Sequence, residues 1–277
     1  MLEIRDDYEL MFNNIINNLR EYLRNSGLKS LIIGLSGGID SALTAALAYE
    51  ALKEIDGIEL IGRSIPIETN KDDEILRAEK TGLNFCNSFE VKDLTNAYIN
   101  LQNDLVSEIR KNDESKDEKI RSGNIKARIR MTYLFDLAHL HKGMVLSTDN
   151  HTELLLGFWT LHGDVGNYGM IQYLWKTEVY GLAKLLADKY RKNGEPDKAE
   201  SLELSIEAVP TDGLGITNSD FDQIGVKSYH EADLLLIDYL KENKDNENHP
   251  VIERYKQSHH KRVDPQNIPR KSILKSP

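Results

Sequence analysis

The sequence predicts an α/β fold with a doubly wound, mostly parallel sheet flanked by helices. First, the apolar run 31–34 is typical of a buried strand, a serine–glycine turn follows it, and apolar residues at helical spacing continue from Ile39. Second, short apolar runs alternate with segments of helical periodicity along the chain, which is the pattern of βαβ units. Third, a length of 277 residues and a hydrophobic content of 40% allow a sizeable core.

Each element is identified by its own period and its stop signal. Helical spacing of apolar residues predicts the helices, and Asn25-Ser26-Gly27 ends the first of them. The predicted helices cover 6–26, 39 onward, 72–83 and 123–141. The predicted strands cover 31–34, 58–66, 88–91 and 144–147.

The remaining stretches are polar. Residues 110–122 are mostly charged and predict a solvated segment, either a helix end or a loop, rather than a domain boundary. We therefore expect one domain over 1–277. Its polar C-terminal tail is expected from about residue 263, loosely ordered at the end.

Charge and cysteine content restrict the partners and the compartment. The chain has 35 Lys and Arg against 45 Asp and Glu, so its net charge is −10 and no nucleic-acid partner is expected. The single cysteine, Cys86, excludes an internal disulfide, favours a reducing compartment and is interpreted as a core residue. The N-terminus does not resemble a signal peptide, and no apolar run has the roughly 18 residues of a membrane span. We expect a cytoplasmic protein with no membrane partner.

A glycine loop, Ser36-Gly37-Gly38, joins the first predicted strand to the following helix. The N–H groups of such a loop and of a helix N-terminus bind anions, and glycines let a phosphate approach closely because they carry no Cβ. No lysine follows the glycines, so this is not a Walker A loop. The alternative is a structural turn in which Asp40 serves only the helix N-terminus.

A second polar cluster, 147–153, follows the last predicted buried strand. Ligands of open α/β sheets bind beyond the carboxyl ends of strands, so we expect both loops to line one crevice and to bring Asp40 and Glu153 together. Carboxylates placed in this way hold Mg²⁺ together with phosphate oxygens. The alternative for Glu153 is a first-turn carboxylate behind a helix cap.

Basic residues form a third set. Arg128 and Arg130 lie two positions apart and point to different sides of a helix, so we expect one to bind a ligand and the other to stay on the surface. Lys126 is interpreted as solvated charge, and Lys176 is expected to precede a further helix.

Two more segments have candidate roles. The segment 210–215 contains a proline and two glycines, and it is either a shaped ligand loop or a plain surface connection. The run 259–262 reads His-His-Lys-Arg. No Cys or carboxylate pattern accompanies it, so we reject a zinc site and favour an anion clamp.

Together these segments resemble the ammonia-dependent NAD synthetases over nearly the whole chain. The matching pieces are 34–41, 123–131, Ser147-Thr148-Asp149 with Glu153 and Gly157-Phe158, Pro210-Thr211, and His260-Lys261-Arg262. The first piece resembles the SGGxDS motif of the PP-loop ATP pyrophosphatases, which cleave ATP to AMP and pyrophosphate. The second, third and fifth pieces together are typical of NAD synthetases. The resemblance implies a Rossmann-like or flavodoxin-like domain that forms a homodimer.

The resemblance also implies an activity and its residues. The implied reaction is ATP-dependent amidation of deamido-NAD by ammonia through an acyl-adenylate, with Mg²⁺ as cofactor and release of AMP and pyrophosphate. The implied catalytic residues are Asp40, Glu153 and Lys176, of which Asp40 and Glu153 would hold Mg²⁺. The implied ATP-binding residues are Gly34, Leu35, Ser36, Gly37, Gly38, Ile39, Asp40, Ser41, Thr148, Lys176 and Thr211. The implied deamido-NAD-binding residues are Arg128, Asn167, His260 and Lys261.

One stretch departs from the family pattern. Leu161 stands where the family usually has a lysine, and Asn167 or Tyr168 stands where it has an aspartate. His162 and Asp164 are the candidates to replace them. The chain has no room for the glutaminase domain of glutamine-dependent relatives, so we expect it to use free ammonia or ammonia from a partner.

Two other interpretations remain open at this point. One is a different PP-loop ATP pyrophosphatase, of the GMP-synthetase-like or the tRNA-thiolating kind, although those enzymes lack the pieces at 126–128 and at His260-Lys261. The other is a non-catalytic nucleotide-binding module, which the presence of both Asp40 and Glu153 disfavours.

Overall fold

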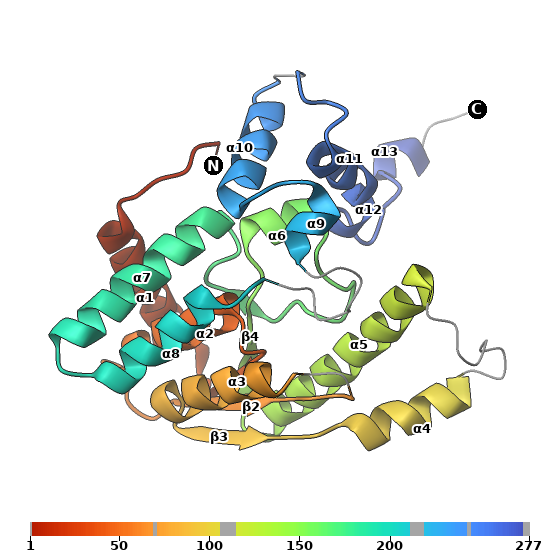
Figure 1. The fold of residues 1–277 in the computed structure, drawn as a ribbon. Coiled ribbons are helices and arrows are strands. Elements are labelled where there is room, and N and C mark those ends of the chain that lie inside the picture. Colours follow the sequence, from red (N-terminus) through yellow and green to blue (C-terminus); the bar gives the residue numbers. More distant parts are fainter. Residues whose placement is uncertain (1, 69–70, 106–114, 211–218, 243–244, 274–277) are drawn as a thin grey trace.

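The computed structural model describes residues 2–68, 71–105, 115–210, 219–242 and 245–273. Within these residues a five-stranded parallel sheet has the order β3-β2-β1-β4-β5 (Figure 1). The strands are β1 (Ser30–Gly34), β2 (Glu59–Ser64), β3 (Ser88–Val91), β4 (Gly143–Ser147) and β5 (Tyr168–Gly169). In the central register Ile32 lies opposite Ile61 on one side and Val145 on the other. The predicted doubly wound parallel sheet is confirmed.

Helices cover both faces of this sheet (Figure 1). In chain order they are α1 (Tyr8–Ser26), α2 (Ile39–Leu52), α3 (Asp72–Phe85), α4 (Thr95–Leu105), α5 (Lys116–Leu140), α6 (His151–Leu156), α7 (Lys176–Lys192), α8 (Pro196–Glu207), α9 (Asp220–Ile224), α10 (Tyr229–Leu240), α11 (Pro250–Gln257), α12 (His259–Arg262) and α13 (Arg270–Ile273). Among the described residues, none of these helices has the length and apolar content needed to cross a membrane.

Alternate residues of each strand pack on opposite faces of the sheet, as the pleat requires. Leu31, Ile33 and Leu146 belong to the larger core, which is built with α1, α2, α3, α7 and α8. Ile32 and Val145 point the other way and pack against α5. Both faces of the central strands are therefore buried, which explains why these strands read as continuous apolar runs.

A third apolar cluster combines α6 with the C-terminal helices α9, α10 and α11. These helices lie together beyond one end of the sheet, where Figure 1 draws the C-terminal ones in blue. Trp175, which is almost fully buried, joins this cluster to the start of α7. The cluster thus covers the end of the sheet from which the loops after β1 and β4 emerge.

The structure corrects two predictions about local structure. The long helix begins at Lys116 rather than near residue 123, because the Ser115 side chain caps it by accepting a hydrogen bond from the Glu118 N–H. Lys126 is buried rather than solvated, and its Nζ lies 3.0 Å from the Glu68 carboxylate. The short helix α13 lies within the predicted polar tail, and residues 274–277 fall outside the described part, so the expected loose order at the end of the tail stays a prediction.

Candidate active site

The strand order reverses between β1 and β4, so the loops that follow these two strands lie side by side. This switch point is where open α/β sheets bind their ligands. A cavity of about 650 Å³ opens here, and its lining includes the whole loop 34–41 together with Thr148, Glu153 and Lys176. The crevice that the sequence predicts is therefore present, and residues from both loops line it.

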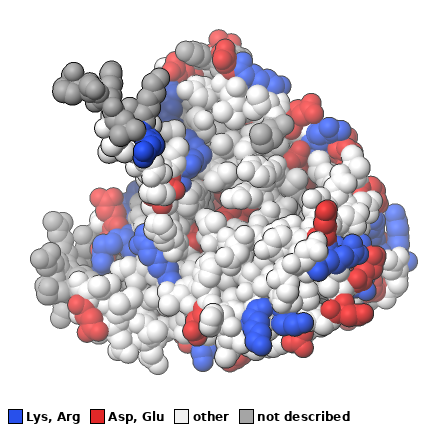
Figure 2. Space-filling view, turned by 180° about the vertical axis from the view of Figure 1, so that it is seen from behind, with Lys and Arg blue, Asp and Glu red and all other residues white. Residues whose placement is uncertain are grey.

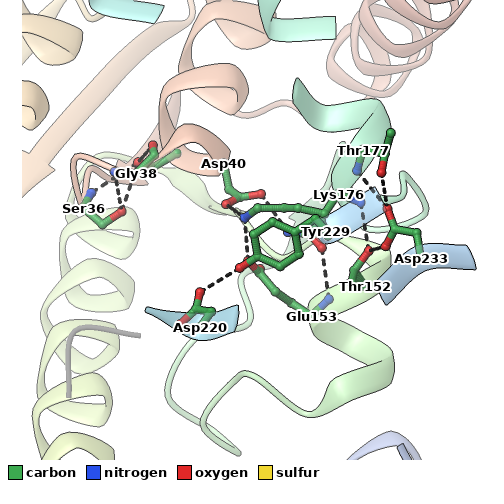
Figure 3. Close-up of polar contacts among 12 residues, drawn as sticks. Ser36, Gly38, Asp40, Thr152, Glu153, Lys176, Thr177, Asp220, Tyr229 and Asp233 are labelled. Carbon is green, nitrogen blue, oxygen red and sulfur yellow. Dashed lines mark hydrogen bonds and ion pairs between the residues drawn. The ribbon is translucent and has the colours of Figure 1, made fainter. Parts of the chain in front are cut away.

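The glycine loop is held in shape by its own serines. Ser36 Oγ accepts a hydrogen bond from the Gly38 N–H at 3.2 Å, and Ser41 Oγ donates to the Gly38 carbonyl at 3.0 Å (Figure 3). Gly38, which precedes α2, offers no side-chain cap to that helix. The first N–H groups of α2 therefore have no capping side chain at this position, which is the arrangement that binds phosphate groups.

Gly37 is required where it stands. Its φ of +82° lies in the left-handed region, and a Cβ at this position would come within 2.2 Å of the Glu74 carbonyl oxygen. Arg77, one turn further along α3, donates from Nε to the Gly37 carbonyl at 2.9 Å. The start of α3 thus packs directly on the glycine loop, so no larger residue fits without moving one of them.

Lys176 joins the two predicted carboxylates. Its Nζ contacts Asp40 and lies 2.8 Å from the Glu153 carboxylate (Figure 3). Asn150 completes the arrangement, because its Nδ2 donates to Asp40 at 2.7 Å and its Oδ1 caps α6 by accepting from the Glu153 N–H at 3.0 Å. Lys176 is the first residue of α7 rather than a residue before it.

The electrostatics of this centre follow from burial. Burial alone would lower the pKa of Lys176, but the charges of Asp40 and Glu153 raise it well above its ordinary value, so the ammonium stays protonated. Burial raises the pKa of Glu153, and the nearby charge of Asp40 raises it further. Carboxyl oxygens are also the ligand type that hard divalent cations take in proteins.

A third carboxylate, Asp149, lines the same cavity at the end of β4. It accepts a hydrogen bond from the Ser147 hydroxyl at 2.6 Å. Burial raises its pKa to about 6, while the hydrogen bond from Ser147 works in the opposite direction. Asp149 therefore adds a group that titrates near neutral pH to the predicted pair.

Comparison with known proteins now decides the family. A family model described as NAD synthase matches residues 11–268. The chain belongs to the NAD synthase family. Among its relatives, the NH(3)-dependent NAD(+) synthetase of Finegoldia magna is 32% identical over 261 residues, which is 92% of this chain and 94% of that protein. The corresponding enzyme of Thermoplasma acidophilum is 31% identical over 274 residues, 95% of this chain and 98% of that protein.

A longer relative and two solved structures complete the comparison. The chain spans only 37% of the glutamine-dependent NAD(+) synthetase of Aquifex aeolicus, with 31% identity over 229 residues. Solved structures with the same fold include the NMN synthetase of Francisella tularensis, with a TM-score of 0.76 at 24% identity over 95% of this chain and 98% of that one. The NH3-dependent NAD synthetase of Campylobacter jejuni has a TM-score of 0.66 at 22% identity over 95% of this chain and 97% of that one.

The residues that the resemblance assigns to deamido-NAD do not all line the cavity. Lys261 lines the cavity, but its Nζ donates to the carbonyls of Gly157, at 2.7 Å, and Trp159. His260 is exposed, and its Nδ1 lies 3.1 Å from the Gln257 carbonyl. Of these two residues, Lys261 therefore lines the cavity and His260 does not.

Two further implied substrate residues lie outside the cavity lining. Arg128 is exposed, and its Nε donates to the Leu161 carbonyl at 3.2 Å. Arg130 lines the cavity instead. The side chain of Asn167 accepts a hydrogen bond from the Val145 N–H at 3.0 Å, next to the pairing of β4 with β5. The ATP-binding candidate Thr211 lies outside the described residues.

The two candidate replacements in the stretch that departs from the family pattern, Asp164 and His162, lie in different places. Asp164 lines the cavity and accepts a hydrogen bond from the Thr160 N–H. Burial raises its pKa. His162 is mainly exposed, and its Nε2 lies 3.4 Å from Asp264. Of the two candidates to replace the missing family residues, only Asp164 faces the ligand space.

Sequence reasoning missed several arginines of the site. Arg63 and Arg77 line the cavity along with Arg130. Arg63 is the penultimate residue of β2, and its carbonyl accepts a hydrogen bond from the Leu35 N–H at 2.8 Å. The strand and the helix that carry Arg63 and Arg77 were predicted correctly, so the available signal was a basic residue within each of these two elements.

Proposed function

We propose that this chain converts deamido-NAD to NAD with ATP and ammonia, releasing AMP and pyrophosphate. Membership of the NAD synthase family supports this reaction, as do the relatives that are NH(3)-dependent NAD(+) synthetases. The observation that carries the proposal is the centre formed by Asp40, Glu153 and Lys176 beside a phosphate-binding loop without a Walker lysine.

The proposed chemistry needs no nucleophile from the protein. The carboxylate of the nicotinate ring attacks the α-phosphorus of ATP, a new O–P bond forms, and the bond to pyrophosphate breaks. Ammonia then attacks the carbonyl carbon of the acyl-adenylate, and AMP leaves. The N–H groups of the loop 34–41 and the ammonium of Lys176 bind and position ATP, while Thr148 and Thr211 complete the proposed contacts.

Asp40 and Glu153 are proposed to hold Mg²⁺. Among the described residues there is no group of three or more His, Cys, Asp or Glu that could hold a metal. A pair of carboxylates fits Mg²⁺, which commonly takes one or two carboxylates and completes its shell with phosphate oxygens and water. When bound, the ion supplies positive charge where pyrophosphate leaves.

The proposed deamido-NAD site consists of Arg128, Asn167, His260 and Lys261. Lys261 has the strongest support because its side chain lines the cavity. Asp164 is the proposed replacement for the family aspartate, at whose place Asn167 or Tyr168 stands, since it also lines the cavity. The substrate carries two phosphates, and cations in the lining lower the repulsion from a chain with a net charge of −10.

The chain is proposed to act in the cytoplasm as a homodimer, without nucleic acid or membrane. The face of the molecule in Figure 2 has its Lys, Arg, Asp and Glu side chains mainly around the edge and a wide uncharged centre. A second copy of the chain is a suitable cover for such a surface. Light scattering at assay concentration tests this, and a fully active monomer contradicts it.

The direct test of the function is an assay with ATP, Mg²⁺, ammonium and deamido-NAD, followed by chromatography of the products. We expect NAD, AMP and pyrophosphate in equal amounts, and no NAD when glutamine replaces ammonium. Stoichiometric ADP contradicts the PP-loop chemistry. Nicotinate mononucleotide, which carries the same ring carboxylate, is the comparison substrate. A higher kcat/KM for the mononucleotide reassigns the substrate while keeping the reaction.

A further inference from the structure

A carboxylate outside the described cavity lining lies directly behind the centre formed by Asp40, Glu153 and Lys176. Asp233 on α10 has no exposed surface. It accepts hydrogen bonds from the Thr152 hydroxyl, from the Thr177 N–H at 2.9 Å and from the Thr177 hydroxyl at 2.7 Å (Figure 3). Its two partners belong to α6 and α7, the helices that carry Glu153 and Lys176.

These partners are the immediate neighbours of the functional residues. Thr152 precedes Glu153 at the start of α6, and Thr177 follows Lys176 at the start of α7. Thr152 also accepts a hydrogen bond from the Lys176 N–H at 2.8 Å. Asp233 therefore ties together the two backbone positions from which Glu153 and Lys176 extend.

The position of Asp233 in the sequence is unusual for a structural residue. The other buried residues of α10 are Tyr229, Ala232, Leu236 and Ile237, so the carboxylate occupies a place on the packed face of the helix. Burial raises its pKa, and the hydrogen bonds from Thr152 and Thr177 act against this effect. A buried carboxylate is costly compared with an apolar residue of similar size, which favours a role beyond packing.

The same face of α10 contacts Lys176 a second time. Tyr229 lies one helical turn before Asp233, and its ring centre is 5.2 Å from Lys176 Nζ. The Tyr229 hydroxyl donates to Asp220 at 2.7 Å, which fixes the ring (Figure 3). One face of α10 thus contacts both the backbone beside Lys176 and its ammonium.

We propose that Asp233 is a positioning residue for the amidation reaction, which holds Lys176 and Glu153 at the separation needed to face ATP and its cation. The proposal rests on the proposed function for its kinetic test. In this role Asp233 acts through its hydrogen bonds with Thr152 and Thr177 and does not contact the substrate.

The first test is Asp233→Asn in the full chain. The amide keeps the size of the side chain but presents N–H groups to donors, so it cannot accept all three hydrogen bonds. We expect kcat to fall by about tenfold to hundredfold with less than threefold change in the KM for deamido-NAD. The matched control is Asp238→Asn on the exposed face of the same helix, which should behave like wild type. An unchanged kcat for Asp233→Asn overturns the proposal.

A second pair of variants keeps Asp233 in place. Thr177→Val removes the hydroxyl donor and keeps the backbone N–H, whereas Thr177→Ser restores the donor. We expect kcat to fall by about threefold to tenfold in the valine variant and to return to within twofold of wild type in the serine variant. If valine and serine behave alike, the hydrogen bond to Asp233 has no positioning role and the proposal is wrong.

A readout independent of activity separates this proposal from the proposed function. Reductive methylation followed by mass spectrometry reports how accessible Lys176 is in the full chain. We expect Lys176 in the Thr177→Val protein to react at least threefold faster than in wild type, and in the Thr177→Ser protein at the wild-type rate. Equal rates in all three proteins overturn the positioning role. Failure of wild type to form NAD, together with faster labelling of the valine variant, contradicts only the proposed function.

Discussion

The glycine loop and the basic C-terminal segment 254–262 both have the sequence character of anion-binding sites, but their side chains are used differently. In the loop, Ser36 and Ser41 bond within the loop itself, and the α2 N-terminus has no side-chain cap at Gly38. In the C-terminal segment, the cations bond mainly to backbone carbonyls of a distant part of the chain.

The partners of these cations share one place, the C-terminal end of α6. Arg254 donates to the Leu156 carbonyl at 2.9 Å, and Arg262 donates to the Leu155 carbonyl at 2.6 Å. Lys261 donates to the next carbonyl, that of Gly157. The last carbonyls of a helix lack intrahelical partners and carry partial negative charge, so cations stabilise them. A basic motif in the sequence can therefore belong to a helix end as well as to a ligand.

The largest effect on the rate is expected for a change at Asp40, which follows the glycine loop. Asp40→Asn should lower the rate of pyrophosphate release by about a thousandfold, because the variant loses one of the two carboxylates that face Lys176 and the proposed cation. ATP binding should change much less. The measurement is pyrophosphate release with and without excess Mg²⁺, with the exposed Asp136→Asn as control. Near-normal release by Asp40→Asn would remove its assignment as a metal ligand.

Alanine variants of Gly37 and Gly27 distinguish the effect of packing against the glycine loop from the effect of backbone strain. Gly37→Ala should lower kcat/KM for ATP by about a hundredfold, since its Cβ would meet the Glu74 carbonyl at 2.2 Å and displace the loop. Gly27 has a similar φ of +70° but nothing within 4 Å of a Cβ. Gly27→Ala should therefore cost only about 1 kcal/mol of stability and leave the KM for ATP unchanged. Equal kinetic loss in both variants would rule out the packing explanation.

The C-terminal side should respond more weakly and with a different substrate. Lys261→Ala should raise the KM for deamido-NAD by about tenfold while leaving the KM for ATP nearly unchanged, because the ammonium lines the cavity and also holds the chain at Gly157 and Trp159. Lys241→Ala, at an exposed position, is the control. Wild-type kinetics would make Lys261 a purely structural contact, and a loss confined to ATP would place it at the phosphate site.

The smallest effect is expected in stability rather than turnover. Burial raises the pKa of Asp149 to about 6 from an ordinary value near 3.8, so the folded state binds the proton more tightly than the unfolded state. The stability contribution of this group is therefore complete below about pH 4 and is lost as the pH rises to about 6. Asp149→Asn keeps the Ser147 contact and avoids the charge. Its free energy of unfolding, measured without metal, should exceed that of wild type by at least about 1 kcal/mol at pH 8 but not at pH 4. A difference that does not depend on pH would contradict this account.

Patterns in the sequence predicted much of the fold. The strands β1 to β4 and the helices α1, α2 and α3 match their predicted ranges closely, because each depends on a local period and a local stop signal. The start of α5 was misplaced because charged residues over 116–122 conceal its first turns, which a cap at Ser115 and an ion pair between Glu118 and Arg121 support. Lys126 was misjudged because its partner, Glu68, lies in another element.

By itself the sequence determined the glycine loop, the parallel sheet and the family, since each is expressed in neighbouring residues or in motifs. Only the tertiary structure decided which charges meet. Asp40 and Lys176 are 136 positions apart, and Lys261 is 102 positions from Trp159. The bonds of Asp233 to Thr152 and Thr177 likewise depend on how α10 packs against α6 and α7. Periodicity shows which face of an element is buried, but a hydrogen bond also requires the direction and distance of a partner, and those arise only when the elements pack.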